Sequence, residues 1–404
     1  MKEPLLYLCH RIPFPPNKGD KITTCNVLKF LSRHFDVYLG CFIDDQFDQR
    51  YVDDVKKLCK ETLFIPLNPS IAKVKGLRAF LTGDPITVPY YSHQKMQNWV
   101  NQVITTHGIE KAFVYSGCMA QYLLNPPTSI HKVIHFADID SDKWRQYAHQ
   151  ATGIMRYVYQ REHTTLEHFE INVADNFDIS CFISETEADQ FKTMVDKQTK
   201  PKIQILENGL DCAYFSPEQP SVLSEPYALD SQNYIVFTGA MDYRPNIDAV
   251  LWFVENVWPS VLAAQPESYF YIVGSAPPKS VLNLAQEKGV VVTGRVEDIR
   301  PYMQHAKGAI APMRMARGIQ NKILEAMAMA KPVLSSTIGM EGLENYPTQY
   351  LSVEDSPEEI TAWIIEKLEN PVLTATESRQ WLEANFSWEA KLTPLLSYLG
   401  ESHE

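Results

Sequence analysis

Two aspartates separated by one residue form the first pattern that suggests chemistry. Asp138 and Asp140 follow an apolar run over residues 133–136, so their carboxylates are expected at the end of a strand. Such a pair can hold a nucleotide-bound divalent ion, because these ions prefer hard oxygen ligands. A solvated turn in which Asp138 or Ser141 caps the next helix explains the same residues equally well. Lys143 stands where a calcium loop needs glycine, which argues against that loop.

A proline-rich loop near the start of the chain is a second candidate. Residues 13–20 contain three prolines and Gly19, ahead of a segment with helical spacing. Glycine lets a ligand approach the backbone, and the free N–H groups of a helix start favour an anion. An ordinary turn punctuated by proline is the alternative interpretation.

In the second half, a glycine turn leads to an arginine at a helix start. Gly239 follows the apolar run 234–237, and Arg244 precedes apolar residues spaced as in a helix from Ile247 to Val257. Another helix is predicted to begin within residues 318–328, followed by Pro332.

Three polar side chains can share one face of that second helix. Asn321 and Lys322 lie four and three residues before Glu325, which is the spacing of neighbours on a helix surface.

Several common catalytic and binding motifs are absent from the sequence. It contains no GxGxxG, no GxxxxGK[ST], no GxSxG and no HExxH pattern. His163 and His168 are five residues apart, so a helix does not align them on one face as metal ligands. The seven cysteines occur singly, which favours reduced thiols over a disulfide framework or a zinc site.

Short apolar runs that alternate with amphipathic segments must position these side chains. Their nearly continuous hydrophobicity predicts parallel strands covered by helices on both faces, arranged as two doubly wound units. Ligands of such units bind at the carboxyl ends of the strands. The runs cover residues 5–9, 37–42, 63–65, 112–115, 133–136 and 179–183, then 234–237, 270–273, 290–293, 309–312 and 333–335.

Composition fits a globular protein of two or three domains. The 404 residues are 45% hydrophobic and carry a formal net charge of −12, which argues against nucleic-acid binding. No stretch approaches the ~18 apolar residues of a membrane span, and no secretory signal is evident, so a cytoplasmic location is expected.

In several longer sequence motifs, the chain resembles the family-four retaining glycosyltransferases of the GT-B fold. NGLDxxxF, TGxMDYRPN, VTGRVEDIRPY and KILEAMAxxKPVLSS appear in that family's order in the second half. RIPFPPNKGDKI and ADIDSDKWRQYA resemble, more narrowly, the sugar transferases associated with exosortase and PEP-CTERM systems, which serve bacterial exopolysaccharide assembly.

This resemblance implies a role for individual residues in binding a nucleotide-sugar. The departing diphosphate needs fixed cations when no metal neutralises it, and Arg244 and Lys322 match the family's basic pair. Glu325 matches the carboxylate that binds the donor ribose. The remaining donor-binding matches are Gly19, Gly239, Arg295, Val296 and Asn321.

One position departs from the family pattern. The glutamate expected eight residues before Glu325 is Arg317 here, which weakens the match for the sugar-binding part of the motif. We hypothesise that Arg317 or Arg314 binds phosphate of the donor or of a lipid-linked acceptor. By the same resemblance, Asp138 is the favoured group near the reacting carbon and His135 is the second choice. A buried structural role for His135 is the alternative.

The resulting expectation is a GT-B protein with three segments. Residues 1–200 form an acceptor-side Rossmann-like domain, residues 201–385 bind the nucleotide-sugar, and residues 386–404 form a helix that packs back on the first domain. The expected reaction retains anomeric configuration, needs no metal cofactor, and moves a sugar, UDP-linked by family habit, to a saccharide or polyprenyl-linked acceptor. The alternatives are a metal-dependent transferase using Asp138 and Asp140, a catalytically silent scaffold, and, more distantly, a sugar-nucleotide epimerase.

Peripheral contact with the inner face of the plasma membrane is a further expectation. No strongly basic amphipathic helix stands out. Lys73, Lys75 and Arg78, beside the apolar residues 77, 80 and 81, can form a small docking patch or an ordinary surface helix.

Overall fold

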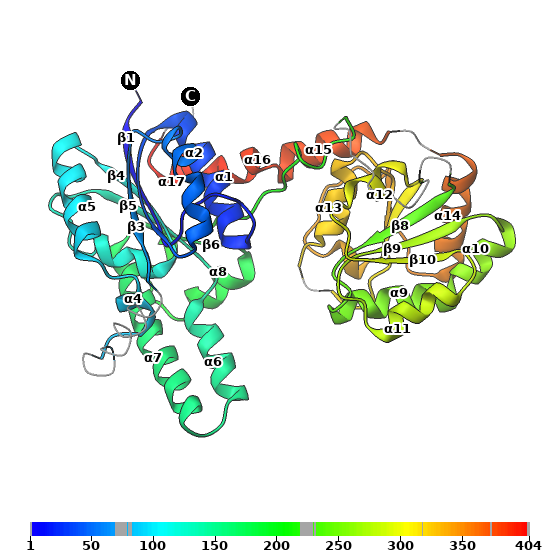
Figure 1. Cartoon of the computed structure of the whole chain (residues 1–404), viewed down its shortest axis with the longest axis horizontal. Coiled ribbons are helices and arrows are strands. Elements are labelled where there is room, and N and C mark those ends of the chain that lie inside the picture. Colours follow the sequence, from blue (N-terminus) through cyan, green and yellow to red (C-terminus); the bar gives the residue numbers. More distant parts are fainter. Residues whose placement is uncertain are drawn as a thin grey trace. The chain divides into compact units, whose positions relative to one another are not determined.

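The computed structural model divides into two compact units, shown in Figure 1. It describes residues 2–68, 79, 83–218, 229, 232–316, 318–371 and 374–401. The first unit comprises Met1–Asn208 and Lys391–Glu404, and the second comprises Gly209–Ala390. The docking patch expected at residues 73–81 falls almost wholly outside the described residues, as does Arg317.

A seven-stranded parallel sheet forms the centre of the first unit, with the order β3-β2-β1-β4-β5-β6-β7. Most strand residues are buried because helices cover both faces, which explains their continuous hydrophobicity. The strands are β1 (Pro4–Cys9), β2 (Asp36–Ile43), β3 (Glu61–Pro66), β4 (Lys111–Tyr115), β5 (His131–Ala137), β6 (Ile179–Phe182) and β7 (Ile203–Ile205).

The helices of the first unit connect these strands, and two of them form a hairpin. The hairpin, α6 and α7, extends away from the sheet (Figure 1). The helices are α1 (Gly19–His34), α2 (Val52–Lys56), α4 (Thr87–Tyr90), α5 (Gln94–His107), α6 (Asp140–Gln150), α7 (Gly153–Asn176) and α8 (Glu185–Lys192), with 3₁₀ turns at Gln46–Tyr51, Gly117–Leu123 and Lys200–Lys202.

The C-terminal segment Lys391–Glu404 belongs to the first unit. It contains the end of α16 (Trp388–Leu392) and all of α17 (Pro394–Tyr398). The Tyr398 hydroxyl donates to the Ile205 carbonyl at 3.1 Å, and the Tyr398 carbonyl lies 2.7 Å from His131 Nε2. These bonds attach α17 beside strands β5 and β7.

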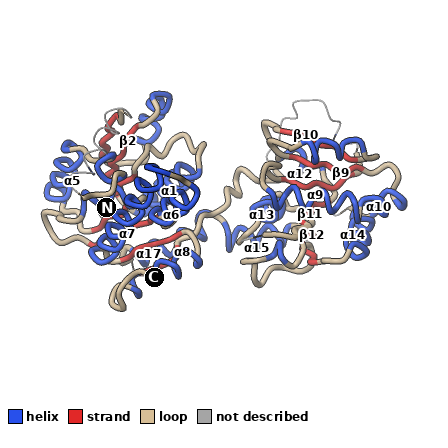
Figure 2. The backbone as a smooth tube through the Cα atoms, turned by 90° about the horizontal axis from the view of Figure 1, so that it is seen from below, coloured by secondary structure: helices blue, strands red, loops and turns tan. Residues whose placement is uncertain are grey.

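The second unit repeats the plan with six parallel strands in the order β10-β9-β8-β11-β12-β13. Figure 2 shows the helices that flank this sheet. The strands are β8 (Tyr234–Thr238), β9 (Tyr269–Val273), β10 (Val290–Gly294), β11 (Gly308–Ala311), β12 (Val333–Ser335) and β13 (Leu351–Val353); the helices are α9 (Arg244–Asn256), α10 (Trp258–Ala264), α11 (Lys279–Leu282), α12 (Arg300–His305), α13 (Asn321–Ala328), α14 (Pro357–Glu369) and α15 (Thr376–Phe386).

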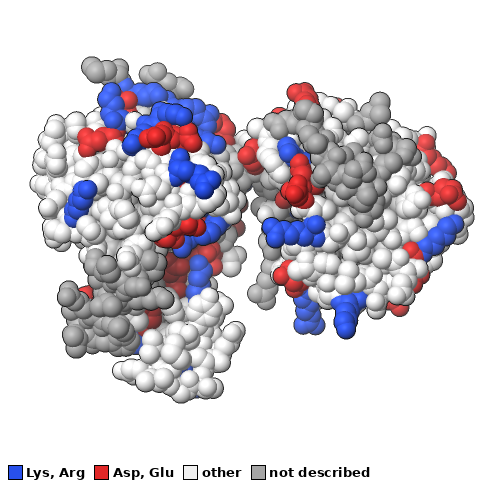
Figure 3. Space-filling model, viewed as in Figure 1, with Lys and Arg blue, Asp and Glu red and all other residues white. Residues whose placement is uncertain are grey.

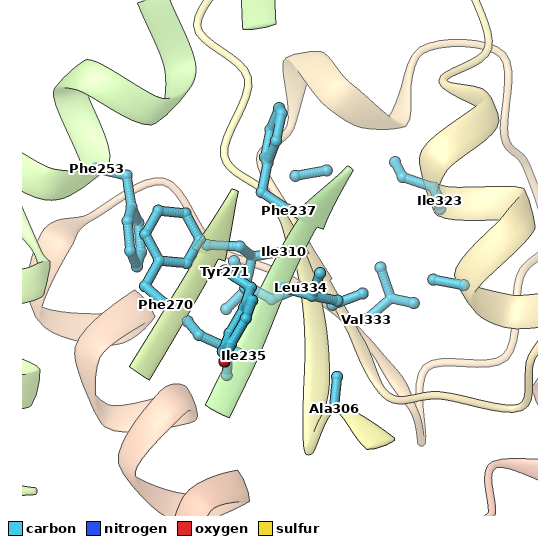
Figure 4. Close-up of a cluster of buried hydrophobic side chains, with 14 of the residues drawn as sticks. Ile235, Phe237, Phe253, Phe270, Tyr271, Ala306, Ile310, Ile323, Val333 and Leu334 are labelled. Carbon is cyan, nitrogen blue, oxygen red and sulfur yellow. The ribbon is translucent and has the colours of Figure 1, made fainter. Parts of the chain in front are cut away.

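Aromatic packing fixes the core of this unit. Figure 4 shows Phe253 of α9 against Phe270 of β9, and their ring centroids are 4.6 Å apart. Ile323 of α13 points into the same buried cluster. The core therefore holds α9 and α13 against one sheet. These helices carry Arg244, Lys322 and Glu325, the candidate donor-binding residues.

All eleven predicted strands are present, and the two-unit parallel architecture is confirmed. Among the described residues, no single helix has the length and apolar composition needed to cross a membrane; the bent pair α9 and α10 meets those two criteria jointly.

Candidate functional site

The order of both sheets reverses direction at one point, and ligands of open parallel sheets bind outside the carboxyl ends of the strands at that point. It lies between β8 and β11 in the second unit and between β1 and β4 in the first. Each of the sites described below is built around one of these two points.

Close backbone contact follows β8 in the second unit. Gly239 has a φ of 155°, and a Cβ built on Gly274 would lie 1.7 Å from the Gly239 carbonyl oxygen. A side chain at Gly274 is therefore excluded. The turn leads directly to Arg244, an exposed residue that begins α9 as predicted.

Lys322 of α13 brings its ammonium group to this point. Its Nζ lies 3.3 Å from Gln320 Oε1, 3.9 Å from Met313 Sδ beyond β11, and 5.3 Å from the ring centroid of Phe237 in β8. Burial lowers the pKa of Lys322 to about 8, and the nearby Glu325 carboxylate opposes this shift. Among the described residues, no carboxylate lies within ion-pair distance of Lys322.

Glu325 lies one helical turn beyond Lys322. Burial raises the pKa of its carboxyl group to about 7, while the charge of Lys322 acts in the opposite direction. Two half-buried groups of opposite charge, without a close ion pair, form a site that a bound anion and bound hydroxyl groups can complete.

The other predicted donor-side residues surround the same edge of the sheet. Arg295 is exposed and Val296 half-buried in the loop after β10, and Asn321 is the exposed first residue of α13. Arg314 lies elsewhere on that edge. It is 3.9 Å from Asp248 and lines a cavity of about 300 Å³ together with Trp252.

A cavity of about 370 Å³ occupies the carboxyl edge of the first sheet. It is lined by residues that directly follow β1, by residues of β4 and β5, and by the start of α1, including Gly19. Its lining consists of His10, Arg11, Gly19, Asp20, Thr23, Tyr115, Ser116, Phe136, Ala137, Asp138, Asp140, Lys143, Ile183 and Asn208.

Both aspartates of the DxD pair line this cavity and share one cation. Lys143 Nζ lies 2.8 Å from Asp138 and 3.1 Å from Asp140. Burial opposes the charged form of Lys143, yet the charges of Asp140 and Asp138 hold its pKa well above the usual value. No cluster of three or more potential metal-ligating His, Cys, Asp or Glu side chains occurs in the part of the chain that the structure describes.

His135 is placed differently from Asp138. Its ring is 1% exposed, Nε2 lies 2.8 Å from the Leu206 carbonyl oxygen, and Nδ1 accepts a hydrogen bond from the Ala137 amide at 2.9 Å. Burial lowers the pKa of His135 to about 4. Both ring nitrogens are therefore engaged by the backbone, and the neutral ring positions the end of β5.

Sequence reasoning missed a charged network on the other side of the cavity. Arg11 joins Asp20 at 2.9 Å and Asp44 at 2.8 Å, and His10 Nε2 lies 3.2 Å from the same Asp20 carboxylate. Burial opposes ionisation of Asp20, but hydrogen bonds and charges from His10 and Arg11 hold its pKa well below the usual value. The only sequence signal was the position of His10 and Arg11 directly after the first predicted strand.

Backbone strain also occurs at this cavity. Ser116 and Ala137, which follow β4 and end β5, have positive φ values of 77° and 70°. Non-glycine residues adopt this conformation rarely, and such strain is often found at binding sites.

Comparison with known proteins bears on both units. Residues 232–370 match the family model described as Glycosyl transferases group 1, a segment that covers about a third of the chain and lies in the second unit. No curated protein matches the sequence.

Solved structures resemble the whole chain. A glycosyltransferase from Rickettsia africae shares 15% identity over 98% of both chains, with a TM-score of 0.56. Anabaena Alr3699/HepE in complex with UDP shares 15% identity, with a TM-score of 0.56 over 99% of this chain and 100% of that one. The trehalose-6-phosphate phosphatase N-terminal domain of Candida albicans also has a TM-score of 0.56, at 11% identity over 100% of this chain and 98% of that one.

Fold and domain match together define the class of protein. The chain has two Rossmann-like units of the GT-B fold, and its second unit carries a glycosyl transferases group 1 domain. The protein is a glycosyltransferase.

Proposed function

We propose that the protein transfers a sugar from a UDP-linked donor to a saccharide or polyprenyl-linked acceptor in bacterial exopolysaccharide assembly. The donor is assigned to the second unit and the acceptor to the first. The observation that carries this proposal is the half-buried Lys322 ammonium at the reversal point of the second sheet, beside Glu325 and without a close ion pair among the described residues.

A nucleoside diphosphate fits this arrangement. Phosphate oxygens supply the negatively charged partner that the Lys322 ammonium lacks among the described residues. Arg244 adds a second cation at the start of α9. The Glu325 carboxylate accepts hydrogen bonds from ribose hydroxyl groups, which is favoured because a carboxylate only accepts. That a similar protein, Anabaena HepE, was solved with UDP supports uridine as the base.

We propose that transfer proceeds without a metal ion and with retention of configuration. Departure of the diphosphate is stabilised by Lys322 and Arg244, which are fixed positive groups. In the first unit, Lys143 pairs with both the Asp138 and the Asp140 carboxylates, which supports a role for these aspartates that does not involve a divalent ion. Asp138, whose side chain is 41% exposed, is the proposed group near the reacting carbon.

The narrower assignments rest on phrases of the sequence. The N-terminal loop and the segment around Asp138 support membership of the exosortase and PEP-CTERM-associated branch. We infer from this branch that the protein is cytoplasmic and works at the inner face of the plasma membrane. Arg317, where the family carries glutamate, favours one alternative function, which is a catalytically silent scaffold of an assembly complex.

Turnover of UDP-sugars tests the proposal. UDP-glucose, UDP-galactose and UDP-N-acetylglucosamine are supplied separately with a bacterial lipid extract, and release of UDP is followed. We expect release with one donor, reduced at least ~100-fold in Arg244→Ala and Lys322→Ala. Lys288→Ala is the matched control, because Lys288 is exposed just before β10 at the opposite edge of the sheet.

Full turnover by both Arg244→Ala and Lys322→Ala contradicts the donor assignment. Absence of any UDP release above background, with intact nucleotide binding, favours the scaffold. Loss of turnover on EDTA treatment supports the metal-dependent alternative at Asp138 and Asp140.

A further inference from the structure

The far end of the α6–α7 hairpin is unusually apolar for an exposed surface. We call residues 147–159 the hairpin tip. Eleven large hydrophobic side chains are exposed among the described residues, and four of them lie in this segment: Tyr147 (51% exposed), Ile154 (78%), Met155 (44%) and Tyr157 (69%). In Figure 3 the visible face of the hairpin's end shows almost no charged side chains.

One buried carboxylate fixes the base of the hairpin to the rest of the first unit, and a second joins the two helices of the hairpin. Glu162 of α7 accepts hydrogen bonds from the amides of Ile86 and Thr87, at 2.6 and 3.0 Å. Glu170, further along α7, accepts from the amide and hydroxyl groups of Ser141 at the start of α6. The hairpin is therefore a supported projection, whose apolar end is not part of the core.

Three aromatic rings pack against one another in the hairpin tip and directly beside it. The ring centroid of Trp144 lies 5.8 Å from that of Tyr147 and 5.5 Å from that of Tyr159. Tyrosine and tryptophan concentrate at the water–lipid boundary, because one part of each ring system is apolar and another part forms hydrogen bonds.

The charges of this region differ from those of the whole chain. Residues 143–161 contain four basic residues and no acidic one, in a protein whose net charge is −12. Lys143 and Arg145 pair with aspartates near the base, whereas Arg156 is exposed within the tip. A strongly acidic protein is repelled by an anionic bilayer except where it presents such an acid-free surface.

We propose that the hairpin tip inserts into the interfacial region of an anionic phospholipid bilayer. Ile154, Met155 and Tyr157 enter the acyl boundary, the aromatic group lies at the headgroups, and Arg156 contacts lipid phosphate. A lipid surface fits better than a second copy of the chain. The tip is a narrow end of two helices, whereas a stable protein interface needs about 800 Å² from each partner.

This contact places the first cavity above the membrane at a defined height. Asp140 and Lys143, at the start of α6, line the cavity, and the 11 residues of α6 span roughly 16 Å at about 1.5 Å per residue. Here the inference rests on the proposed function, because a polyprenyl-linked acceptor is anchored in the same bilayer. The hairpin then holds the cavity close to the membrane surface, where the acceptor lies.

Vesicle flotation of the full chain tests the inference. The probes are vesicles of phosphatidylcholine alone and vesicles with about a third phosphatidylglycerol. We expect the wild type to float with the anionic vesicles, and Ile154→Ser/Tyr157→Ser to lose at least ~10-fold in partitioning. Leu282→Ser is the matched control, since Leu282 is a 48% exposed leucine of α11 in the second unit.

Three results overturn the inference. The first is that the wild type does not bind anionic vesicles, and the second is that the double variant binds them equally well. The third is that the wild type is a dimer without lipid whereas the double variant is a monomer. Equal thermal unfolding midpoints show that the variant is folded. UDP binding by the second unit is measured in parallel, so that failure of vesicle binding with intact UDP binding refutes the hairpin proposal and leaves the proposed function standing.

Discussion

Replacing Lys322 with methionine separates two effects of its charge: a decrease in the free energy of unfolding and a contribution to UDP binding. Methionine is similar in length to lysine and carries no charge, so the packing beside Phe237 and Met313 is largely kept. Burial lowers the pKa of Lys322 from 10.5 to about 8. We expect Lys322→Met to be more stable than the wild type and to bind UDP poorly.

The size and sign of the stability change follow from proton linkage. Below pH 8, Lys322 is charged in both the folded and unfolded states, and the half-buried charge costs about 3 kcal/mol because its pKa falls from 10.5 to about 8. Between pH 8 and 10.5 the unfolded chain binds the additional proton, so the stability of the wild type rises with pH. The advantage of Lys322→Met should therefore fall from about 3 kcal/mol at pH 7 to about 1 kcal/mol at pH 10.

Nucleotide affinity changes in the opposite direction. A hydrogen bond to a charged group contributes about 1.5–3 kcal/mol, so UDP should bind roughly 10- to 100-fold more weakly to Lys322→Met. Urea unfolding at the two pH values and titration calorimetry at pH 7 measure the two effects separately.

Lys331 provides the matched control for both measurements. Burial also lowers its pKa to about 8, but its ammonium donates to the Gln304 backbone carbonyl, and it lies before β12 at the opposite edge of the sheet. Lys331→Met should leave UDP affinity unchanged. The reasoning is refuted if Lys322→Met keeps wild-type UDP affinity, or if its stability difference from the wild type does not depend on pH.

Three further predictions concern ionisation and catalysis. UDP affinity should be highest between pH 7 and 8, since Glu325 ionises near 7 and Lys322 loses its proton near 8; calorimetry that shows no decrease from pH 8 to pH 9 contradicts this. Asp138→Asn should lower turnover about 100-fold or more while UDP affinity stays constant, and parallel losses of both would indicate a structural role. Burial raises the pKa of Glu170 to about 8, so its contribution to stability falls as pH rises from about 4.5 to 8. Glu170→Gln should therefore raise the thermal unfolding midpoint more at pH 9 than at pH 5. An equal change at both pH values would argue against a buried charge.

The strands of both sheets were predictable because parallel strands covered on both faces are almost uniformly apolar. Tyr234–Thr238, for example, is buried at every position. β7 (Ile203–Ile205) and β13 (Leu351–Val353) were missed, since each has three residues at a sheet edge and a partly exposed side. Three residues of which only the first is buried do not form the continuous apolar run on which the prediction depends.

The second unit's candidate site could be predicted in part because its residues are local in sequence. Lys322 and Glu325 share one helix, and their spacing alone indicates a common face. The cluster of His10, Asp20 and Asp44 could not be predicted in this way, because parallel strand pairing and the start of α1 bring its members together. Nor could spacing reveal that Ile154 and Tyr157 are exposed, since apolar residues three apart usually face a core.

The central claim is that the second unit binds a nucleoside diphosphate through its own cations. Calorimetric titration of the purified protein with UDP and GDP, each with and without EDTA, tests it most directly. We predict that UDP binds with the same affinity in the presence and absence of EDTA, and that Arg244→Ala abolishes binding. Binding that requires a metal ion, or no binding of either nucleotide, would contradict the claim.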